Sequence, residues 1–136
     1  MSFKDDLAAA KKLRPEPILV PVAVGESMYQ VEVSRLPGTT WDAIMSRCPA
    51  RSEQHFAVGY DTGKAAVVAS TEHGRLLDAD GDPVENPDWD GLFEVISGIE
   101  LRAIAAAWWG QNVNDPDQAV TALKKASAAR ESSSSN

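Results

Sequence analysis

Two valine-rich runs on either side of a glycine turn constrain the fold more than any other part of the sequence. In Ile18 to Val24 and in Met28 to Leu36, valines alternate with other residues, as in strands with one buried face. Gly25-Glu26-Ser27 separates the runs, and glycine supplies the positive φ that tight hairpin turns require. The pattern therefore predicts a β-hairpin. Because Pro21 lacks an amide donor, its strand is expected at an outer edge.

A helix is predicted directly after the hairpin. Pro37-Gly38 ends the second strand, and Thr39 with Asp42 three residues later has the spacing of a helix N-terminus. Pro49 closes this helix. Its apolar residues recur at helical spacing and form one stripe: Trp41, Ile44, Met45 and Cys48.

The middle of the chain is less regular. Ala50 to Tyr60 has no clear pattern. Lys64 to Ser70 is compatible with a strand or a helix, because a short apolar run does not define the period, although its alanines and a possible cap at Asp61 favour a helix. Leu76 to Val84 contains an Asp80-Gly81 turn and is compatible with a second small hairpin.

Three consecutive helices are predicted for the second half, and their short links favour antiparallel packing. Asn86 caps the first helix at Pro87, and Gly98 suits its end. Ser97 and Glu100 then have capping-box spacing, and Asp115-Pro116 opens the last helix. The expected buried stripes are Trp89, Leu92, Phe93 and Ile96; then Leu101, Ile104, Ala105 and Trp108; then Ala119, Val120, Leu123 and Ala126.

These elements predict an α+β fold, with an N-terminal β-hairpin followed by a mainly helical domain. Residues 1–15 are expected to form a short amphipathic helix capped by Ser2 and stopped by Pro15. Residues 16–129 are expected to form one domain, which suits a chain of 136 residues. Residues 130–136 form a serine-rich tail that is predicted to be disordered.

The charge disfavours several classes of partner. Thirteen basic and twenty acidic residues give a net charge of −7, which repels nucleic acids and anionic membranes. Eight carboxylates and no Lys or Arg lie between Leu76 and Leu101, so this segment is either a solvated acidic face or a docking face for a basic partner. One cysteine, no leader and no apolar run of ~20 residues indicate a protein of the cytoplasm.

No catalytic, cofactor-binding or metal-binding residue is predicted, and the chain is expected not to be an enzyme. Asp78 to Asp82 resembles a calcium loop, but the glycine and the final glutamate of such a loop are missing from their positions. Cys48 lies on an apolar stripe and is therefore expected in the core. An enzymatic alternative would require a deep pocket in which Cys48 or His55 meets a carboxylate.

The tryptophans suggest a binding surface instead. Trp41, Trp89 and Trp108 lie on core stripes, whereas Trp109 is turned about 100° around the helix from Trp108. The two rings cannot face one neighbour, so one of them is expected to reach the surface, where tryptophan is a typical interface anchor. The predicted partner-binding residues are Trp108, Trp109, Val120 and Leu123.

The order of motifs resembles the short tail assembly chaperones of long-tailed phages that infect actinobacteria. After the valine-rich hairpin come RLPGTTWD at Arg35 to Asp42, an alanine-rich segment at Lys64 to Ser70, DWDGLFE at Asp88 to Glu94, IAAAWWGQN at Ile104 to Asn112, and ALKKAS at Ala122 to Ser127. This resemblance implies a protein of the infected host's cytoplasm that is absent from the mature virion. It would bind the tape measure protein, keep it soluble and help recruit tail tube protein.

The resemblance also implies a longer, frameshifted form of the same protein as a partner. The reading frame would slip near Lys124-Lys125-Ala126. The alternative within phage biology is a structural protein, such as a head–tail connector or tail-completion protein, which would share the small acidic α+β character.

Overall fold

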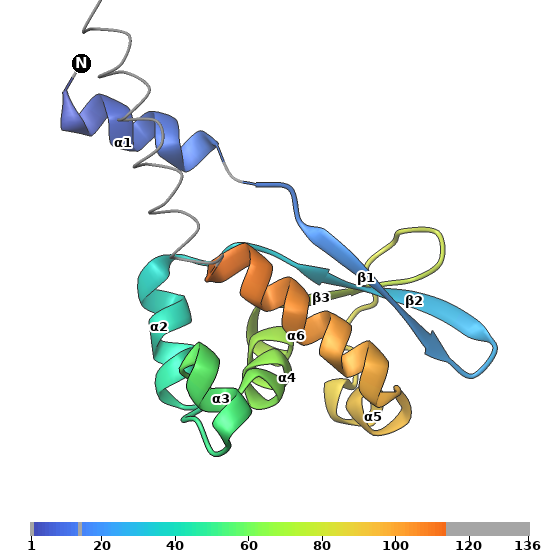
Figure 1. Cartoon of the computed structure of the whole chain (residues 1–136). Helices are drawn as coiled ribbons and strands as arrows, with labels where there is room; N and C mark the ends of the chain where they lie inside the picture. Colours follow the sequence, from blue (N-terminus) through green and yellow to red (C-terminus); the bar gives the residue numbers. More distant parts are fainter. Residues whose placement is uncertain (1, 14, 114–136) are drawn as a thin grey trace, which may run out of the picture.

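A three-stranded antiparallel sheet and six helices make up the described part of the chain, residues 2–13 and 15–113 of a computed structural model (Figure 1). In chain order the elements are α1 (Phe3–Lys12), β1 (Ile18–Val24), β2 (Ser27–Val33), α2 (Gly38–Ser46), α3 (Glu53–Val58), α4 (Thr62–His73), β3 (Arg75–Leu77), α5 (Trp89–Val95) and α6 (Gly98–Asn112). The α+β class and the N-terminal hairpin are confirmed. The predicted helix from Asp115 and the tail 130–136 lie outside the described residues.

The hairpin pairs β1 with β2 through a two-residue turn. Val24 lies opposite Ser27, and Gly25 in the turn has a φ of 63°. β3 joins the other side of β2, with Leu76 opposite Val31, so the sheet order is β1-β2-β3. The expected hairpin of Leu76 to Val84 is present only as a single bridge between Leu77 and Pro83. The pairing of β3 with β2 is a long-range contact that the local pattern did not predict.

The free edge of β1 is blocked at two positions. The amide of Ala23 points away from β2 and donates to the Glu100 carboxylate of α6 at 2.7 Å. Pro21 lies two residues earlier on the same side and has no amide to donate. The predicted position of Pro21 on an edge strand is therefore confirmed, and the outward amide of Ala23 already has an acceptor.

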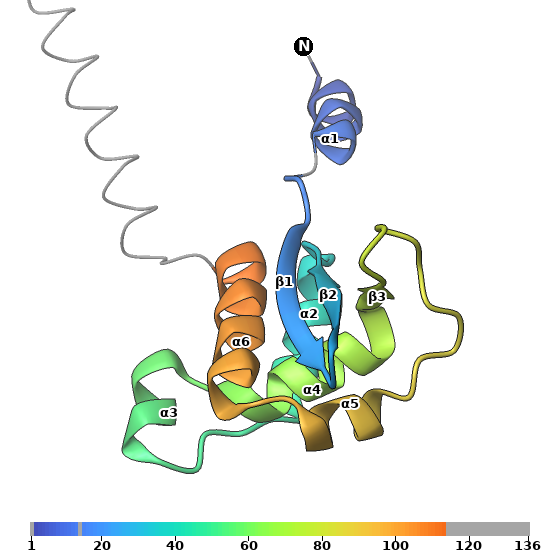
Figure 2. The same cartoon turned by 90° about the vertical axis from the view of Figure 1, so that its right-hand side faces the viewer.

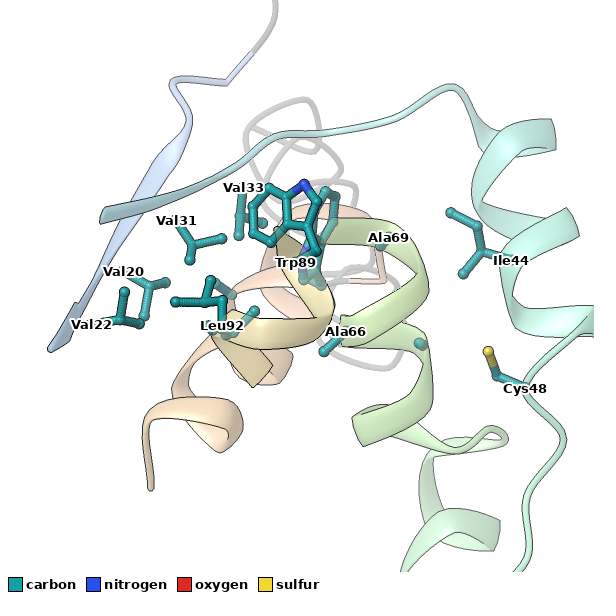
Figure 3. Close-up of a cluster of buried hydrophobic side chains, with 14 of the residues drawn as sticks. Val20, Val22, Val31, Val33, Ile44, Cys48, Ala66, Ala69, Trp89 and Leu92 are labelled. Carbon is teal, nitrogen blue, oxygen red and sulfur yellow. The ribbon is translucent and has the colours of Figure 1, made fainter. Parts of the chain in front are cut away.

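One face of the sheet packs against α4 and α6. α6 stands beside β1, and α4 crosses beneath the sheet (Figure 2). Figure 3 shows the inward valines of the hairpin facing Leu92 and Trp89 of α5. Four side chains provide most of the sheet's contribution to this core: Val20, Val22, Val31 and Val33.

Two stacked tryptophans form the centre of the helical part of the core. The rings of Trp41 and Trp108 lie 6.3 Å apart and 11° from parallel, and Tyr60 meets Trp41 edge-on. The indole Nε1 of Trp108 donates to the hydroxyl of Ser70 at 3.0 Å, whereas Nε1 of Trp41 is buried and has no acceptor among the described residues. These contacts hold α2, α4 and α6 together.

Small residues on α4 allow α6 to approach closely. Ala65, Ala66 and Ala69 are fully buried, and the helix begins at a cap in which Asp61 accepts the amide of Lys64. The preference for helix over strand at Lys64 to Ser70 is therefore confirmed.

Both ends of α6 are tied to the hairpin. The predicted capping box of Ser97 and Glu100 is confirmed, and the same Glu100 reaches Ala23. At the other end, the side chain of Asn112 donates to the carbonyl of Ser34 and accepts the amide of Leu36 at 2.7 Å. α6 is thereby fixed along the whole length of the hairpin.

Several predicted helix boundaries are wrong. α2 begins at Gly38 after Pro37, and no side chain caps it, so Thr39 is not its cap. α5 begins at Trp89 because Asp88 accepts the amide of Gly91. Asn86 instead has a φ of 45° in the preceding loop, and Gly98 is the first residue of α6 rather than the end of α5.

The predicted row of three antiparallel helices is not confirmed. α5 and α6 each pack against α4 instead of forming a pair of their own, and the third helix lies outside the described residues. α3 was not predicted, although Ser52 caps it through the amide of His55. Among the helices of the described part, each falls short of the length and apolarity needed to cross a bilayer.

Candidate protein-binding surfaces

The adjacent tryptophans of α6 have different environments, as their angular separation requires. Trp108 is 1% exposed, and its ring and indole nitrogen are both engaged in the core. It therefore offers no surface to a partner in this conformation. Trp109 is half-buried and packs against the edge of the core. The other predicted partner-binding residues, Val120 and Leu123, lie outside the described residues.

Trp109 lines a hollow of about 280 Å³, the Trp109 hollow, which the sequence did not reveal. Its floor is the outer side of α6, where Ala105 and Ala106 leave space because their side chains are small. Val58 at the end of α3 is 40% exposed and forms another wall. The apolar walls suit the insertion of a side chain from a protein partner. Thr62 and Arg102 complete the lining.

A second hollow of about 290 Å³ lies on the other side of the domain, between the hairpin and α5. We call it the acidic groove and define it by its walls: Val24, Tyr29, Val84, Asp88, Leu92 and Val95. These residues come from two stretches that are distant in the sequence, the hairpin and residues 84–95, so no local motif identifies the groove. The run of carboxylates after Leu76 was the only signal, and it favoured a solvated face over a docking face.

A third hollow, of about 500 Å³, lies between the end of α1 and the segment 35–37. Leu13 and Pro15 line one side, and Leu36 and Pro37 line the other. Because α1 contains no buried residue, the shape of this hollow depends on a helix that the core does not hold. Its size alone therefore does not make it the better candidate.

His55 meets a carboxylate, which is part of what an enzymatic alternative requires. Its Nε2 lies 3.5 Å from Oδ1 of Asp61, while its Nδ1 accepts the amide of Arg51. Asp61 also accepts from the Arg51 guanidinium and from the amide of Lys64. Burial alone would raise the pKa of Asp61, but these hydrogen bonds hold it below its ordinary value. The cluster joins α3 to α4, and its polar groups are already engaged in doing so.

Cys48 is fully buried on the inner side of the loop after α2, as its stripe predicted. Burial raises the pKa of its thiol, which keeps it protonated and weakly nucleophilic. In the acidic loop, the carboxylate of Asp78 accepts the amides of Asp80 and Asp82 and so stabilises the turn. Within residues 2–13 and 15–113, no group of three or more His, Cys, Asp or Glu is arranged to hold a metal ion.

Comparison with known proteins assigns no family to the chain. No family model matches it, and neither a curated protein nor a solved structure shows a significant match. The function must therefore be inferred from the sequence motifs and from the surfaces of the domain.

Proposed function

We propose that this protein is a tail assembly chaperone of a long-tailed phage, which binds the tape measure protein, keeps it soluble and assists tail tube assembly. The resemblance of the motifs from Arg35 to Ser127 supports the family. The Trp109 hollow is the observation that carries the binding role, because it presents a half-buried tryptophan and an apolar cavity on a folded, acidic domain.

A tape measure chain explains why such a hollow would be useful. A long helical protein without its tube exposes apolar stripes that promote aggregation. The Trp109 hollow can take an apolar side chain from such a stripe, in the manner of a helix bound in a groove. The chaperone's net charge of −7 then keeps the complexes apart by mutual repulsion.

α3 offers a second exposed apolar residue besides Val58. Phe56 is 69% exposed and lies about 160° around the helix from Val58, so it is a separate contact and not a wall of the hollow. α3 has no buried residue and is joined to Asp61 through His55, so its apolar side chains are available to a partner. The aromatic residue at the hollow has the character of an interface anchor, where truncation commonly costs more than ~2 kcal/mol of binding.

Co-expression with the tape measure protein tests the proposal directly. We expect Val58→Asp combined with Trp109→Ser to abolish co-purification, because a charge and a lost ring remove both walls of the hollow. Leu19→Ser is the matched control, since Leu19 is also an exposed apolar residue but lies on the sheet. Circular dichroism must show a folded domain for each variant. Undiminished capture by the double variant would refute the assignment of the hollow.

A second pair of variants tests the candidates beyond the described residues. Val120→Ser with Leu123→Ser should reduce capture of the tape measure protein if the last predicted helix contributes to the surface. Retained capture would restrict the surface to the Trp109 hollow and its neighbours.

Analysis of purified phage particles separates the chaperone from the structural alternative. We propose that the protein acts in the cytoplasm of the infected host and is absent from the virion, so mass spectrometry of particles should not detect it. Its detection at stoichiometric amounts would favour a head–tail connector or tail-completion protein. A slippery heptamer near the codons of Lys124 and Lys125, followed by an overlapping frame, would support the longer frameshifted form.

A further inference from the structure

The acidic groove is apolar inside and anionic around its rim. Val24 and Tyr29 come from the hairpin, Val84 from the loop after β3, and Leu92 and Val95 from α5. Leu92 is buried at the floor, whereas Val95 is 62% exposed at the mouth. The groove therefore has a firm base and an accessible apolar wall.

No cation neutralises this rim among the residues that the structure describes. The eight carboxylates between Leu76 and Leu101 take part in none of the ion pairs there. Three of them accept backbone amides: Asp78, Asp88 and Glu100. The other five are exposed to solvent: Asp80, Asp82, Glu85, Asp90 and Glu94.

The carboxylates nearest the groove come from its own lining and from residues that flank it. Asp88 lines the groove, and Glu85 follows Val84 in the loop after β3. On α5, Glu94 flanks the side of the helix that lines the groove, whereas Asp90 lies about 160° around the helix from Leu92. Neighbouring carboxylates without a cation between them repel one another, and a bound cation relieves that repulsion. The groove and its rim therefore suit a ligand that places an apolar side chain inside the groove and a positive charge outside it.

The size of the groove favours a side chain over a small molecule. Its volume of about 290 Å³ is at the lower limit of the ~300–1,000 Å³ that small-molecule sites occupy.

We propose that the acidic groove binds a basic amphipathic helical segment of another protein, with apolar residues in the groove and Lys or Arg over the rim. This surface lies apart from the Trp109 hollow, and the proposal does not depend on the identity of the chaperone's client. A symmetric contact between the grooves of two copies is disfavoured, because two such rims would meet with the same sign of charge. Nucleic acids and anionic lipids are repelled for the same reason.

Binding of two synthetic amphipathic peptides to the full-length protein tests this proposal. Both carry Leu at i, i+3, i+4 and i+7, and one has Lys on its flanks where the other has Glu. By calorimetry, we expect the Leu/Lys peptide to bind and the Leu/Glu peptide not to bind. Raising the salt toward 1 M, where charges are screened beyond about 3 Å, should weaken the binding.

Variants of the rim and the wall localise the binding. Glu85→Gln and Glu94→Gln together should weaken binding of the Leu/Lys peptide about fivefold, because each exposed charge pair contributes a modest amount to the binding free energy. The matched control removes two exposed carboxylates elsewhere: Asp6→Asn and Glu53→Gln. Val95→Ser should weaken binding about fivefold by removing apolar contact.

The proposal is overturned if the rim variant and the charge-matched control bind the Leu/Lys peptide equally. It is also overturned if amide chemical shift changes map to α3 and the outer side of α6 instead of α5 and the hairpin. Concentration-dependent dimerisation in sedimentation, abolished by Val95→Ser, would identify a second copy as the occupant instead.

Discussion

The two helices at the opposite ends of the described chain, α1 and α6, look similar in sequence and differ completely in the structure. Each begins at a serine cap, Ser2 in α1 and Ser97 in α6, and each carries apolar residues at helical spacing. α6 buries Ile104, Ala107 and Trp108, whereas α1 buries nothing and leaves Phe3 80% exposed. Figure 1 shows α1 standing away from the body of the domain.

Long-range polar contacts account for this difference. α6 is joined to the hairpin through Glu100 at its start and Asn112 near its end. In the described part of the chain, the bonds that cap α1 are local: the amide of Asp5 donates to the Ser2 hydroxyl, and the amide of Leu13 donates to the carbonyl of Ala10. An apolar stripe therefore predicts that a helix forms, but burial requires a second surface that is held at the right distance.

The largest expected effect follows from truncating the centre of the buried helix. Trp108→Ala should reduce the free energy of unfolding by about 4 kcal/mol, because it creates a cavity against Trp41 and leaves the Ser70 hydroxyl without its partner. Urea denaturation of the variant measures this loss. Trp109→Ala is the control and should cost much less, and equal losses would contradict the assignment of Trp108 to the core.

Removing the tie at the end of α6 should have a smaller effect. Asn112→Ala deletes a side chain that bonds Ser34 and Leu36, and it leaves the amide of Leu36 part-buried without an acceptor. We expect a loss of about 2 kcal/mol in urea denaturation, with faster amide exchange at Leu36. A loss within error of zero would show that packing alone holds α6 on the hairpin.

The tie at the start of α6 should depend on pH. Hydrogen bonds from Ser97 and Ala23 lower the pKa of Glu100 below its ordinary value of 4.5. The stabilisation is therefore complete above pH 4.5 and is lost as the pH falls through the lower pKa of the folded state. Glu100→Gln should flatten this part of the stability profile. An unchanged acid dependence in the variant would contradict the role of Glu100.

The smallest effect is expected at α1. Phe3→Ser and Leu7→Ser should each change the free energy of unfolding by less than about 0.5 kcal/mol, because neither side chain is buried. Thermal unfolding of both variants measures this. A loss comparable with that of Asn112→Ala would mean that α1 packs on the body in solution and would remove the contrast between the two helices.

Local patterns predicted those elements whose causes are local. The hairpin follows from alternating valines and Gly25, and the capping box of α6 follows from Ser97 and Glu100, which lie three residues apart. The boundary of α5 was wrong because Asn86 and Asp88 are both good caps. Only the backbone conformation, with a positive φ at Asn86, decides between them.

The candidate surfaces could be predicted only in part. The angle between Trp108 and Trp109 follows from helical geometry, so different environments for the two rings were predictable. Which ring is buried depends on Ser70 and Trp41, far away in the sequence. The acidic groove needs the hairpin, the loop after β3 and α5 to meet, and the position of β3 is itself a long-range pairing.

The edges of the sheet affect how copies of this protein behave when they are crowded together. An unprotected strand recruits the same strand of a neighbour, and repetition of that step produces fibres. Here Pro21 of β1 has no amide to donate, the amide of Ala23 already donates to the Glu100 carboxylate, and the opposite edge strand has only three residues. Association through backbone ladders is therefore disfavoured, which leaves side chains as the main means of recognising a partner.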